Sequence, residues 1–204
     1  MGGTALAYYL NHRISEDIDI ICDGPLPYKK IITNIQSIGG KKLRDENAVA
    51  LRMAGLFPDE YMLKFDLHGV KLEFFRASTP LQKEILLDAK LNPYKNGLLQ
   101  IPDVKSIAKL KIIALILRNK SRDLFDFHII LEKEILNTKE ILAVCLETKQ
   151  IDSLSSLHTF LEKKTEPKDD ESVYLDENRP INFTFDEIKE KTLLSLACKV
   201  DTSA

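Results

Sequence analysis

The segment from Tyr61 to Phe75 (YMLKFDLHGVKLEFF) constrains the fold more than any other part of this 204-residue chain. Two runs of alternating apolar and polar residues flank His68-Gly69, which is the pattern of two antiparallel strands joined by a tight turn. The pairs that would share the apolar face are Leu67 with Val70, Phe65 with Leu72, and Leu63 with Phe74. The polar face would carry Lys64, Asp66, Lys71 and Glu73. The sequence therefore predicts a β-hairpin with one side in a core and the other side polar.

Apolar periodicity divides the chain into an α/β half and a helical half, with the boundary near residues 79–100. In the first half we expect a helix at 4–10 with Thr4 as its N-cap, strands at 17–22 and about 48–53, and a helix at 28–38. In the second half we expect helices at 103–117, 124–136, 139–147 and 153–163 and a capped helix from Thr184. The polar stretch 165–180, with proline near both ends, predicts a loop or linker.

Composition excludes several classes of protein. The 29 basic and 31 acidic residues nearly cancel, unlike the strongly basic domains that hold nucleic acid by charge alone. Cys22, Cys145 and Cys198 are odd in number and far apart, which argues against a disulfide framework or a zinc site. No apolar run approaches the roughly 20 residues of a membrane span, and the start lacks the order of a signal peptide. We therefore expect a cytoplasmic protein with no membrane partner.

The strongest chemical motif is Asp17-Ile18-Asp19, which follows a Gly2-Gly3-Thr4 turn and a short helix. Residues two apart on a strand point to the same face, so both carboxylates emerge together and repel each other unless a cation lies between them. Carboxylates suit Mg²⁺, and glycine amides at a helix N-terminus suit phosphate. Taken alone, however, an Asp-x-Asp pair is more often an exposed strand face than a metal site.

Glu73 is the candidate for a third carboxylate, because it lies on the polar face of the predicted hairpin. A third carboxylate would let the site hold two metal ions for an in-line displacement at phosphorus. The structural alternative is a solvated hairpin residue that pairs with Lys64 across the strands, and Asp66 on the same face is the fallback ligand.

A second group of charges runs from Lys111 to Asp126 (KIIALILRNKSRDLFD). Lys111 and Arg118 are seven residues apart and share one face of a predicted helix, where they could contact a triphosphate. Asp123 and Asp126 could orient these cations, accept a proton or cap the next helix. Charged residues on amphipathic helices are usually solvated surface, so this stretch alone is a weak signal.

In order, these motifs resemble the AbiEii/AbiGii-type nucleotidyltransferase toxins of the polymerase-β-like nucleotidyltransferase superfamily. The resemblance covers roughly residues 2–130. It rests on three segments: Gly2-Gly3-Thr4-Ala5-Leu6, His12-Arg13-Ile14-Ser15-Glu16-Asp17-Ile18-Asp19, and Lys111 through Arg118 to Arg122-Asp123-Leu124-Phe125-Asp126. Family members usually carry a helix before the glycines, whereas this sequence starts at them.

The resemblance implies an α+β fold in which a mixed or antiparallel sheet with flanking helices is followed by a C-terminal α-helical region. Residues 1–90 would form the nucleotidyltransferase core, and residues 91–204 would complete the nucleotide cleft. By this analogy, Asp17, Asp19 and Glu73 would be the catalytic and metal-binding residues. The expected nucleotide-binding residues are Gly2, Gly3, Thr4, Arg13, Ser15, Lys111, Arg118, Asp123 and Asp126.

The hypothesis that follows is Mg²⁺-dependent transfer of a nucleoside monophosphate from a nucleoside triphosphate to an acceptor hydroxyl, with two metal ions. The acceptor would be an RNA end or a protein, and an antitoxin would be a partner. Two alternatives stay open from the sequence. One is a small-molecule transferase of the antibiotic-modifying kind, and the other is a module that senses nucleotides or binds a partner without turnover.

Overall fold

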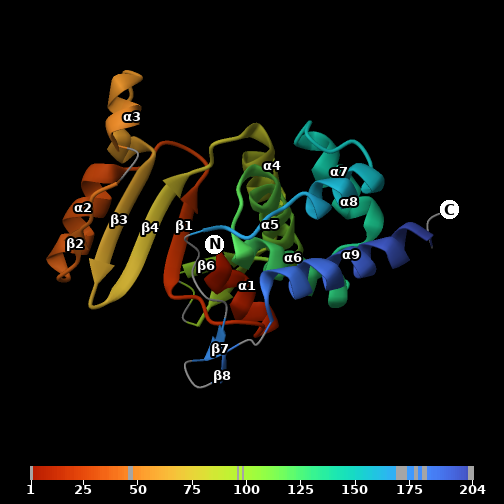
Figure 1. The fold of residues 1–204 in the computed structure, drawn as a ribbon. Coiled ribbons are helices and arrows are strands. Elements are labelled where there is room, and N and C mark those ends of the chain that lie inside the picture. The colour runs from red at the N-terminus through yellow and green to blue at the C-terminus, as the bar shows by residue number, and fades with distance from the viewer. Residues whose placement is uncertain are drawn as a thin grey trace. The chain divides into compact units, whose positions relative to one another are not determined.

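The protein was analysed as a computed structural model, which describes residues 2–45, 48–95, 97, 99–168, 174–176, 179–180 and 183–201. The chain forms two compact units, labelled by element in Figure 1. The first comprises Met1–Ala5 and Ser15–Asp88, and the second comprises Leu6–Ile14 and Ala89–Ala204. The sequence-based division has one boundary near residue 90, whereas here the second unit also takes in residues 6–14.

The first unit is built on a mixed four-stranded sheet in the order β1-β4-β3-β2. Its strands are β1 (Asp17–Cys22), β2 (Lys41–Lys42), β3 (Met62–Leu67) and β4 (Val70–Arg76). The predicted hairpin is confirmed residue by residue, because Leu67 pairs with Val70, Phe65 with Leu72 and Leu63 with Phe74. Strand β1 lies parallel to β4, while β3 is antiparallel to both β4 and β2.

The apolar face of this sheet is packed against helix α2 (Tyr28–Ser37), which Figure 1 shows beside the strands. The buried cluster consists of Leu26, Leu63, Phe65 and Leu72. Half-buried side chains of α2 pack against it: Tyr28, Ile31, Ile32 and Ile35. Because α2 and this cluster occupy one face, the charged residues of β1, β3 and β4 are directed to the other. The fold thus presents a row of charged side chains on a rigid sheet.

Two local predictions are wrong. Residues 48–53 form a short helix, α3 (Ala48–Met53), and not a strand. The sequence AVALRM contains mostly strong helix formers and shows no regular alternation, so helix propensity decides here. Thr4 is not the N-cap of the first helix, because α1 (Gly3–Leu10) begins one residue before it. Its hydroxyl donates instead to the backbone carbonyl of Asp17 in β1.

The first unit also contains three elements that the sequence pattern did not predict: β2, η1 (Pro58–Glu60) and α4 (Pro80–Asp88). The second unit adds a small hairpin of β5 (Leu91–Tyr94) and β6 (Leu99–Pro102), which was not predicted either. Apart from α4, these elements have two to four residues each, which is too few to establish an apolar period.

Helices form most of the second unit, as predicted: α5 (Val104–Leu117), α6 (Ser121–Glu132), α7 (Thr138–Glu147), α8 (Leu154–Glu162) and α9 (Phe185–Asp201). The predicted caps are present at both ends of this series. Asp103 accepts a hydrogen bond from the Ser106 amide at 3.1 Å, and Thr184 and Glu187 form a reciprocal capping box. Helix α6 begins three residues earlier than predicted.

The core of the second unit is made by the facing apolar sides of these helices. Its fully buried members include Ile107, Ile112, Leu115, Leu124, Phe127, Ile130 and Leu131. The predicted linker at 165–180 lies partly outside the described residues; within it, β7 (Tyr174–Asp176) pairs with β8 (Arg179–Pro180). In the part of the chain that the structure describes, none of the helices is both long and apolar enough to cross a membrane.

Candidate active site

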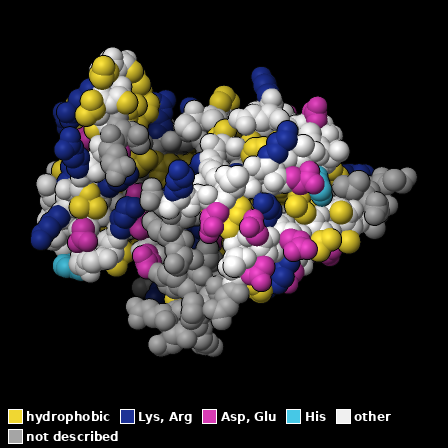
Figure 2. Space-filling model, in the orientation of Figure 1, with side chains coloured by type: hydrophobic (Ala, Val, Ile, Leu, Met, Phe, Trp, Pro, Cys, Tyr) yellow, Lys and Arg dark blue, Asp and Glu magenta, His cyan; other side chains and the backbone are white. Residues whose placement is uncertain are grey.

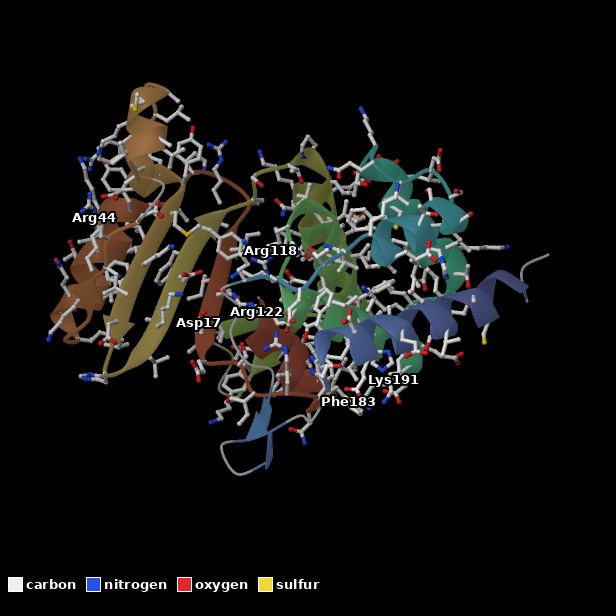
Figure 3. All side chains as sticks on the ribbon, viewed as in Figure 1. Asp17, Arg44, Arg118, Arg122, Phe183 and Lys191 are labelled. Carbon is white, nitrogen blue, oxygen red and sulfur yellow. The ribbon has the colours of Figure 1, made fainter. Side chains whose placement is uncertain are left out.

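Three carboxylates lie on the polar face of the first unit's sheet. Asp17 and Asp19 alternate with isoleucines on β1, and Asp19 is paired directly with Glu73 on the neighbouring strand β4. Partners on adjacent strands point to the same face, so all three side chains emerge on one side of the sheet. Figure 3 shows Asp17 on β1. The hairpin pattern predicts the face of Glu73, but not that Asp19 is its neighbour.

Lys71 stands between two of these carboxylates, and sequence reasoning missed it. Its Nζ lies 3.4 Å from Asp17 Oδ2 and 3.0 Å from Glu73 Oε1. Burial alone would lower the pKa of Lys71, but Glu73 and then Asp17 outweigh that effect and raise the pKa above its ordinary value. The ammonium therefore supplies the positive charge that two neighbouring carboxylates require.

The donor set suits a divalent cation, because carboxylate oxygens are the ligands that Mg²⁺ prefers. The side chains are nevertheless not arranged as a finished cage. Among the described residues, no three histidine, cysteine or acidic side chains are grouped so that they could hold a metal ion. A metal would have to take over the role of Lys71 between Asp17 and Glu73. The residues thus fit the ion in chemistry and in strand position, while the ammonium of Lys71 lies between two of them.

The glycine turn approaches the same carboxylates. A Cβ atom on Gly2 would overlap with the carboxylate of Asp19, so any other residue at this position would require the Asp19 side chain to move. The hydroxyl of Thr4 ties the first turn of α1 to the backbone of β1 at Asp17. Gly2 and Thr4 therefore lie beside the two aspartates, and the phosphate contacts predicted for Gly2, Gly3 and Thr4 stay a prediction. The N-terminus of α1, with its partial positive charge, lies against this acidic pair.

The second unit contains a separate cluster of buried charges centred on Asp126, which is fully buried. Its Oδ1 accepts from Arg13 Nε at 2.7 Å and lies 2.7 Å from His12 Nε2, while its Oδ2 accepts from Arg13 Nη2 at 3.0 Å. Lys111 Nζ is 2.6 Å from the same Oδ2. Burial alone would raise the pKa of the Asp126 carboxyl, but Lys111, His12 and Arg13 together hold it well below its usual range.

Asp123, one helical turn earlier on α6, extends this cluster. Its carboxylate is fully buried and accepts two hydrogen bonds from Arg118, from Nε at 2.6 Å and from Nη2 at 2.9 Å. Lys111 Nζ also lies 3.5 Å from Asp123, so this lysine bridges both aspartates. The structure thus joins Arg13, Lys111, Arg118, Asp123 and Asp126 in one network.

The placement of these residues differs from the one expected for nucleotide ligands. The side chains of Arg13 and Lys111 are only 5% and 7% exposed, and both are engaged by Asp126. Arg118, labelled in Figure 3, is the exception, with 49% of its side chain exposed. Ser15 is half-buried just before β1. The sequence motif did not predict that His12 belongs to the cluster around Asp126, although its position next to Arg13 could have indicated it.

Comparison with known proteins agrees with this architecture. A model of the family "Nucleotidyl transferase AbiEii toxin, Type IV TA system" matches residues 1–191. The protein aq_aa25 of Aquifex aeolicus (strain VF5) is 30% identical over 142 residues, which are 69% of this chain and 60% of that protein. The match thus spans about three-fifths of that relative's length.

Two crystal structures from Helicobacter pylori share the fold. One, of a protein described as a candidate nucleotidyltransferase, has a TM-score of 0.51 at 16% identity, with 98% of this chain and 85% of that chain covered. The other, JHP933, has a TM-score of 0.51 at 17% identity, with 98% and 82% covered. The nucleotidyltransferase-type α+β fold expected from the resemblance is thereby confirmed. With the family match extending over residues 1–191, the chain belongs to the AbiEii nucleotidyltransferase toxin family of type IV toxin–antitoxin systems.

Proposed function

We propose that this protein transfers a nucleoside monophosphate from a nucleoside triphosphate to an acceptor hydroxyl in a Mg²⁺-dependent reaction. The observation that carries the proposal is the sharing of one sheet face by Asp17, Asp19 and Glu73 beside the Gly2 turn. Carboxylates in such a position are the ligands that a phosphoryl-transfer enzyme needs, and family membership points to the same chemistry.

In the proposed reaction the acceptor oxygen forms a bond to the α-phosphorus. The bond from this phosphorus to the bridging oxygen of the β-phosphate breaks, and pyrophosphate leaves with the electron pair. The hydroxyl proton passes to water. Bound Mg²⁺, held by Asp17, Asp19 and Glu73, would favour the deprotonated acceptor and offset the charge of the leaving pyrophosphate. The amides of Gly2 and Gly3 and the hydroxyl of Thr4 would approach the phosphates from the N-terminus of α1.

Lys71 has two roles in this proposal. Without nucleotide it neutralises Asp17 and Glu73, as its distances of 3.4 and 3.0 Å indicate. With Mg²⁺ held by the carboxylates, the ammonium of Lys71 would be released from Asp17 and Glu73 and could contact the triphosphate. A lysine acts as a mobile point charge on a flexible stem, which suits such an exchange.

For the second unit we propose a positioning role in place of direct nucleotide contact. Asp126 and Asp123 bind Lys111, and Asp126 also binds His12 and Arg13, which lie a few residues before β1. The network therefore holds the segment that leads into the catalytic strand. Arg118, with its half-exposed side chain, remains our candidate for a phosphate contact.

The family description also supports a toxin whose partner is an antitoxin, and we propose this pairing for the chain. The second candidate function is nucleotide sensing without turnover. The specific observation in its favour is Lys71, because an ammonium that stays between Asp17 and Glu73 would exclude the metal.

One experiment separates these functions. The protein is incubated with each α-labelled nucleoside triphosphate, Mg²⁺, total RNA and lysate protein, in parallel with Asp17→Ala and the control Asp23→Ala. Asp23 is an exposed carboxylate just beyond β1, outside the pairing with β4. We expect label transfer by the wild type and by Asp23→Ala and its loss in Asp17→Ala. Transfer that survives Asp17→Ala would refute the proposed site. Nucleotide- and Mg²⁺-dependent thermal stabilisation without any transfer would establish the sensing function.

A further inference from the structure

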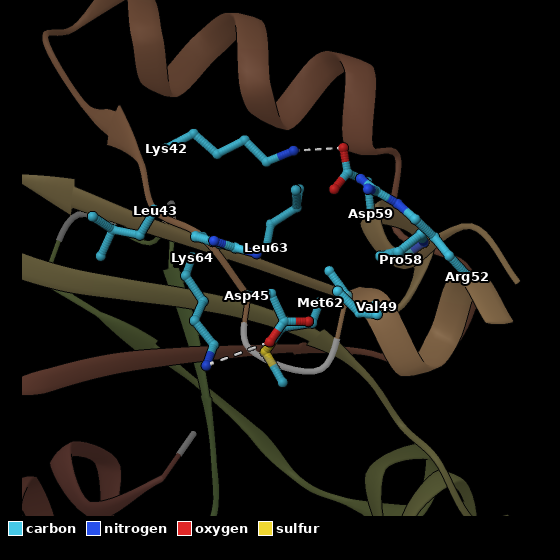
Figure 4. A pocket seen from close by; sticks show the side chains of 12 residues that line it. Lys42, Leu43, Asp45, Val49, Arg52, Pro58, Asp59, Met62, Leu63 and Lys64 are labelled. Carbon is cyan, nitrogen blue, oxygen red and sulfur yellow. Dashed lines mark hydrogen bonds and ion pairs between the residues drawn. The ribbon is translucent and has the colours of Figure 1, made fainter. Parts of the chain in front are cut away.

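The first unit contains a pocket at the edge of the sheet that lies away from β1. It has a volume of about 150 Å³ and is formed by β2, α3, η1 and β3. Figure 4 shows the side chains that line it. Val49 of α3, Pro58 of η1 and Met62 of β3 provide apolar walls. Arg44, Arg52 and Lys64 contribute positive charge.

The charges of this pocket are only partly balanced. Lys42 Nζ binds Asp59 Oδ2 at 2.6 Å, and Lys64 Nζ lies 3.7 Å from Asp45 Oδ1; both interactions are drawn in Figure 4. The guanidinium groups of Arg44 and Arg52 form no hydrogen bond or ion pair with any other residue that the structure describes. Both arginines are exposed, so their forked donors are available to a ligand. An anion with more than one oxygen would satisfy them.

The pocket adjoins the carboxylates through one side chain. Lys64, which lines the pocket, also places its Nζ 3.8 Å from Glu73 Oε1. In the sheet order β1-β4-β3-β2, strand β3 is two strands from β1. Two strand spacings are roughly 10 Å. The two arginines lie beyond β3, next to β2 and on α3, so a strand of a few nucleotides would be needed to extend from the β1 carboxylates to them.

We propose that the pocket with Arg44 and Arg52 binds a backbone phosphate of an RNA acceptor, a few nucleotides from the hydroxyl that reacts. The inference rests on the proposed function, because it takes the bound RNA to be the acceptor of the nucleoside monophosphate. A nucleoside triphosphate is the less suitable ligand, because the glycine turn that would hold its phosphates lies on the β1 side. The net charge of −2 also fits local recognition of a strand end, not a long basic track.

The surface around the pocket supports this assignment. Figure 2 shows dark blue basic side chains and yellow apolar ones gathered over α3. Val49 is 53% exposed beside the pocket, and Met53, on the same helix, is 85% exposed. Apolar side chains next to cations suit nucleic acid, since bases offer flat apolar faces beside each phosphate.

The test measures RNA binding without nucleotide and with EDTA, so catalysis plays no part in the readout. A short, mixed-sequence, fluorescein-labelled oligoribonucleotide is titrated with the wild type, with Arg44→Gln/Arg52→Gln and with Lys29→Gln/Lys30→Gln. The control removes the same charge from exposed residues of α2, which do not line the pocket. Salt is varied between about 50 and 200 mM.

We expect about tenfold weaker binding by the arginine variant at low salt and a salt slope reduced by about 0.7, which corresponds to one lost phosphate contact on a single strand. The lysine control should bind like the wild type. The thermal shift of the arginine variant with ATP and Mg²⁺ should also equal that of the wild type.

The inference is overturned if the wild type does not bind the oligoribonucleotide, or if both double variants lose affinity equally. It is also overturned if Arg44→Gln/Arg52→Gln loses its ATP shift, since the pocket would then hold the nucleotide. Failure of the proposed function gives a different result, in which RNA binding depends on the arginines although the wild type transfers no label. Transfer to RNA with equal acceptor KM in both double variants would leave the function intact and contradict the inference.

Discussion

Replacing Asp126 by asparagine tests whether the buried cluster holds the second unit together. The carboxylate is fully buried and is contacted by His12, Arg13 and Lys111 at 2.6–3.0 Å. Asparagine keeps the volume but removes the charge, so the ion pairs of Asp126 with Arg13 and Lys111 are lost, and Lys111 retains Asp123 at 3.5 Å. Breaking a buried ion pair on one side costs about 3–5 kcal/mol of unfolding free energy.

That magnitude can be measured by thermal and urea unfolding. At roughly 2–4 °C per kcal/mol for a chain of this size, Asp126→Asn should lower Tm by roughly 6–20 °C. The matched control is Asp186→Asn, which removes a carboxylate of 84% exposure that pairs with Lys189 at 3.2 Å. Such an exposed pair contributes about 0–1 kcal/mol, so the control should unfold close to the wild type. If the two variants unfold alike, the buried cluster is not a source of stability.

The pH dependence supplies an independent check on the same residue. Because the pKa of Asp126 in the folded protein lies well below its ordinary value, its carboxylate stabilises the fold at neutral pH. This contribution is retained as pH falls to about 3.9, the unfolded value, and is lost below it on the way to the folded pKa. The stability difference between wild type and Asp126→Asn should therefore persist to about pH 4 and narrow below about pH 3.9. A difference that does not narrow as the pH falls below about 3.9 would contradict this assignment.

Three further predictions concern other sites. Gly2→Ala would push Asp19 aside, so it should lower the rate of nucleotidyl transfer about a hundredfold. Its Tm should change by less than about 3 °C. A variant with wild-type activity would refute the close approach of Gly2 to Asp19. Lys71→Met should raise the affinity for Mn²⁺ in the absence of nucleotide, measured by electron paramagnetic resonance, whereas unchanged affinity would show that Lys71 does not compete with the metal. Burial raises the pKa of the Cys145 thiol to about 12, so iodoacetamide at pH 8 should modify the exposed Cys198 first and Cys145 only after unfolding, as mass spectrometry would show.

Local periodicity was enough to predict the hairpin and the capped helices. The alternation around His68-Gly69 determines which residues pair, because a shift by one residue would move every apolar side chain of the strand to the wrong face. Asp103 and Thr184 were recognisable as caps because their side chains bind amides only three residues away. Interactions of this kind are encoded within a few positions of the chain.

Contacts between distant segments were not predictable in the same way. Arg13 and Asp126 are 113 residues apart, and nothing in either motif identifies the other as its partner. The parallel pairing of β1 with β4, which places Asp19 beside Glu73, likewise depends on tertiary structure. Because the sequence does not show these pairings, it predicts Lys111 and Arg13 to be cations that could bind a nucleotide. The structure shows instead that both side chains are buried in ion pairs. The prediction of a strand at 48–53 is wrong for a different reason, because six residues do not establish an apolar period.

The central claim is that Asp17, Asp19 and Glu73 catalyse nucleotidyl transfer. The most direct test measures where the α-phosphate and the γ-phosphate of the nucleotide are found after the reaction. A triphosphate labelled at the α-phosphate and one labelled at the γ-phosphate are compared with the wild type and Asp19→Asn, with Mg²⁺ and RNA. The account predicts that the α-label joins the acceptor, that the γ-label leaves as pyrophosphate, and that Asp19→Asn abolishes both. Transfer of the γ-label to an acceptor, or equal α-label transfer by Asp19→Asn, would contradict it.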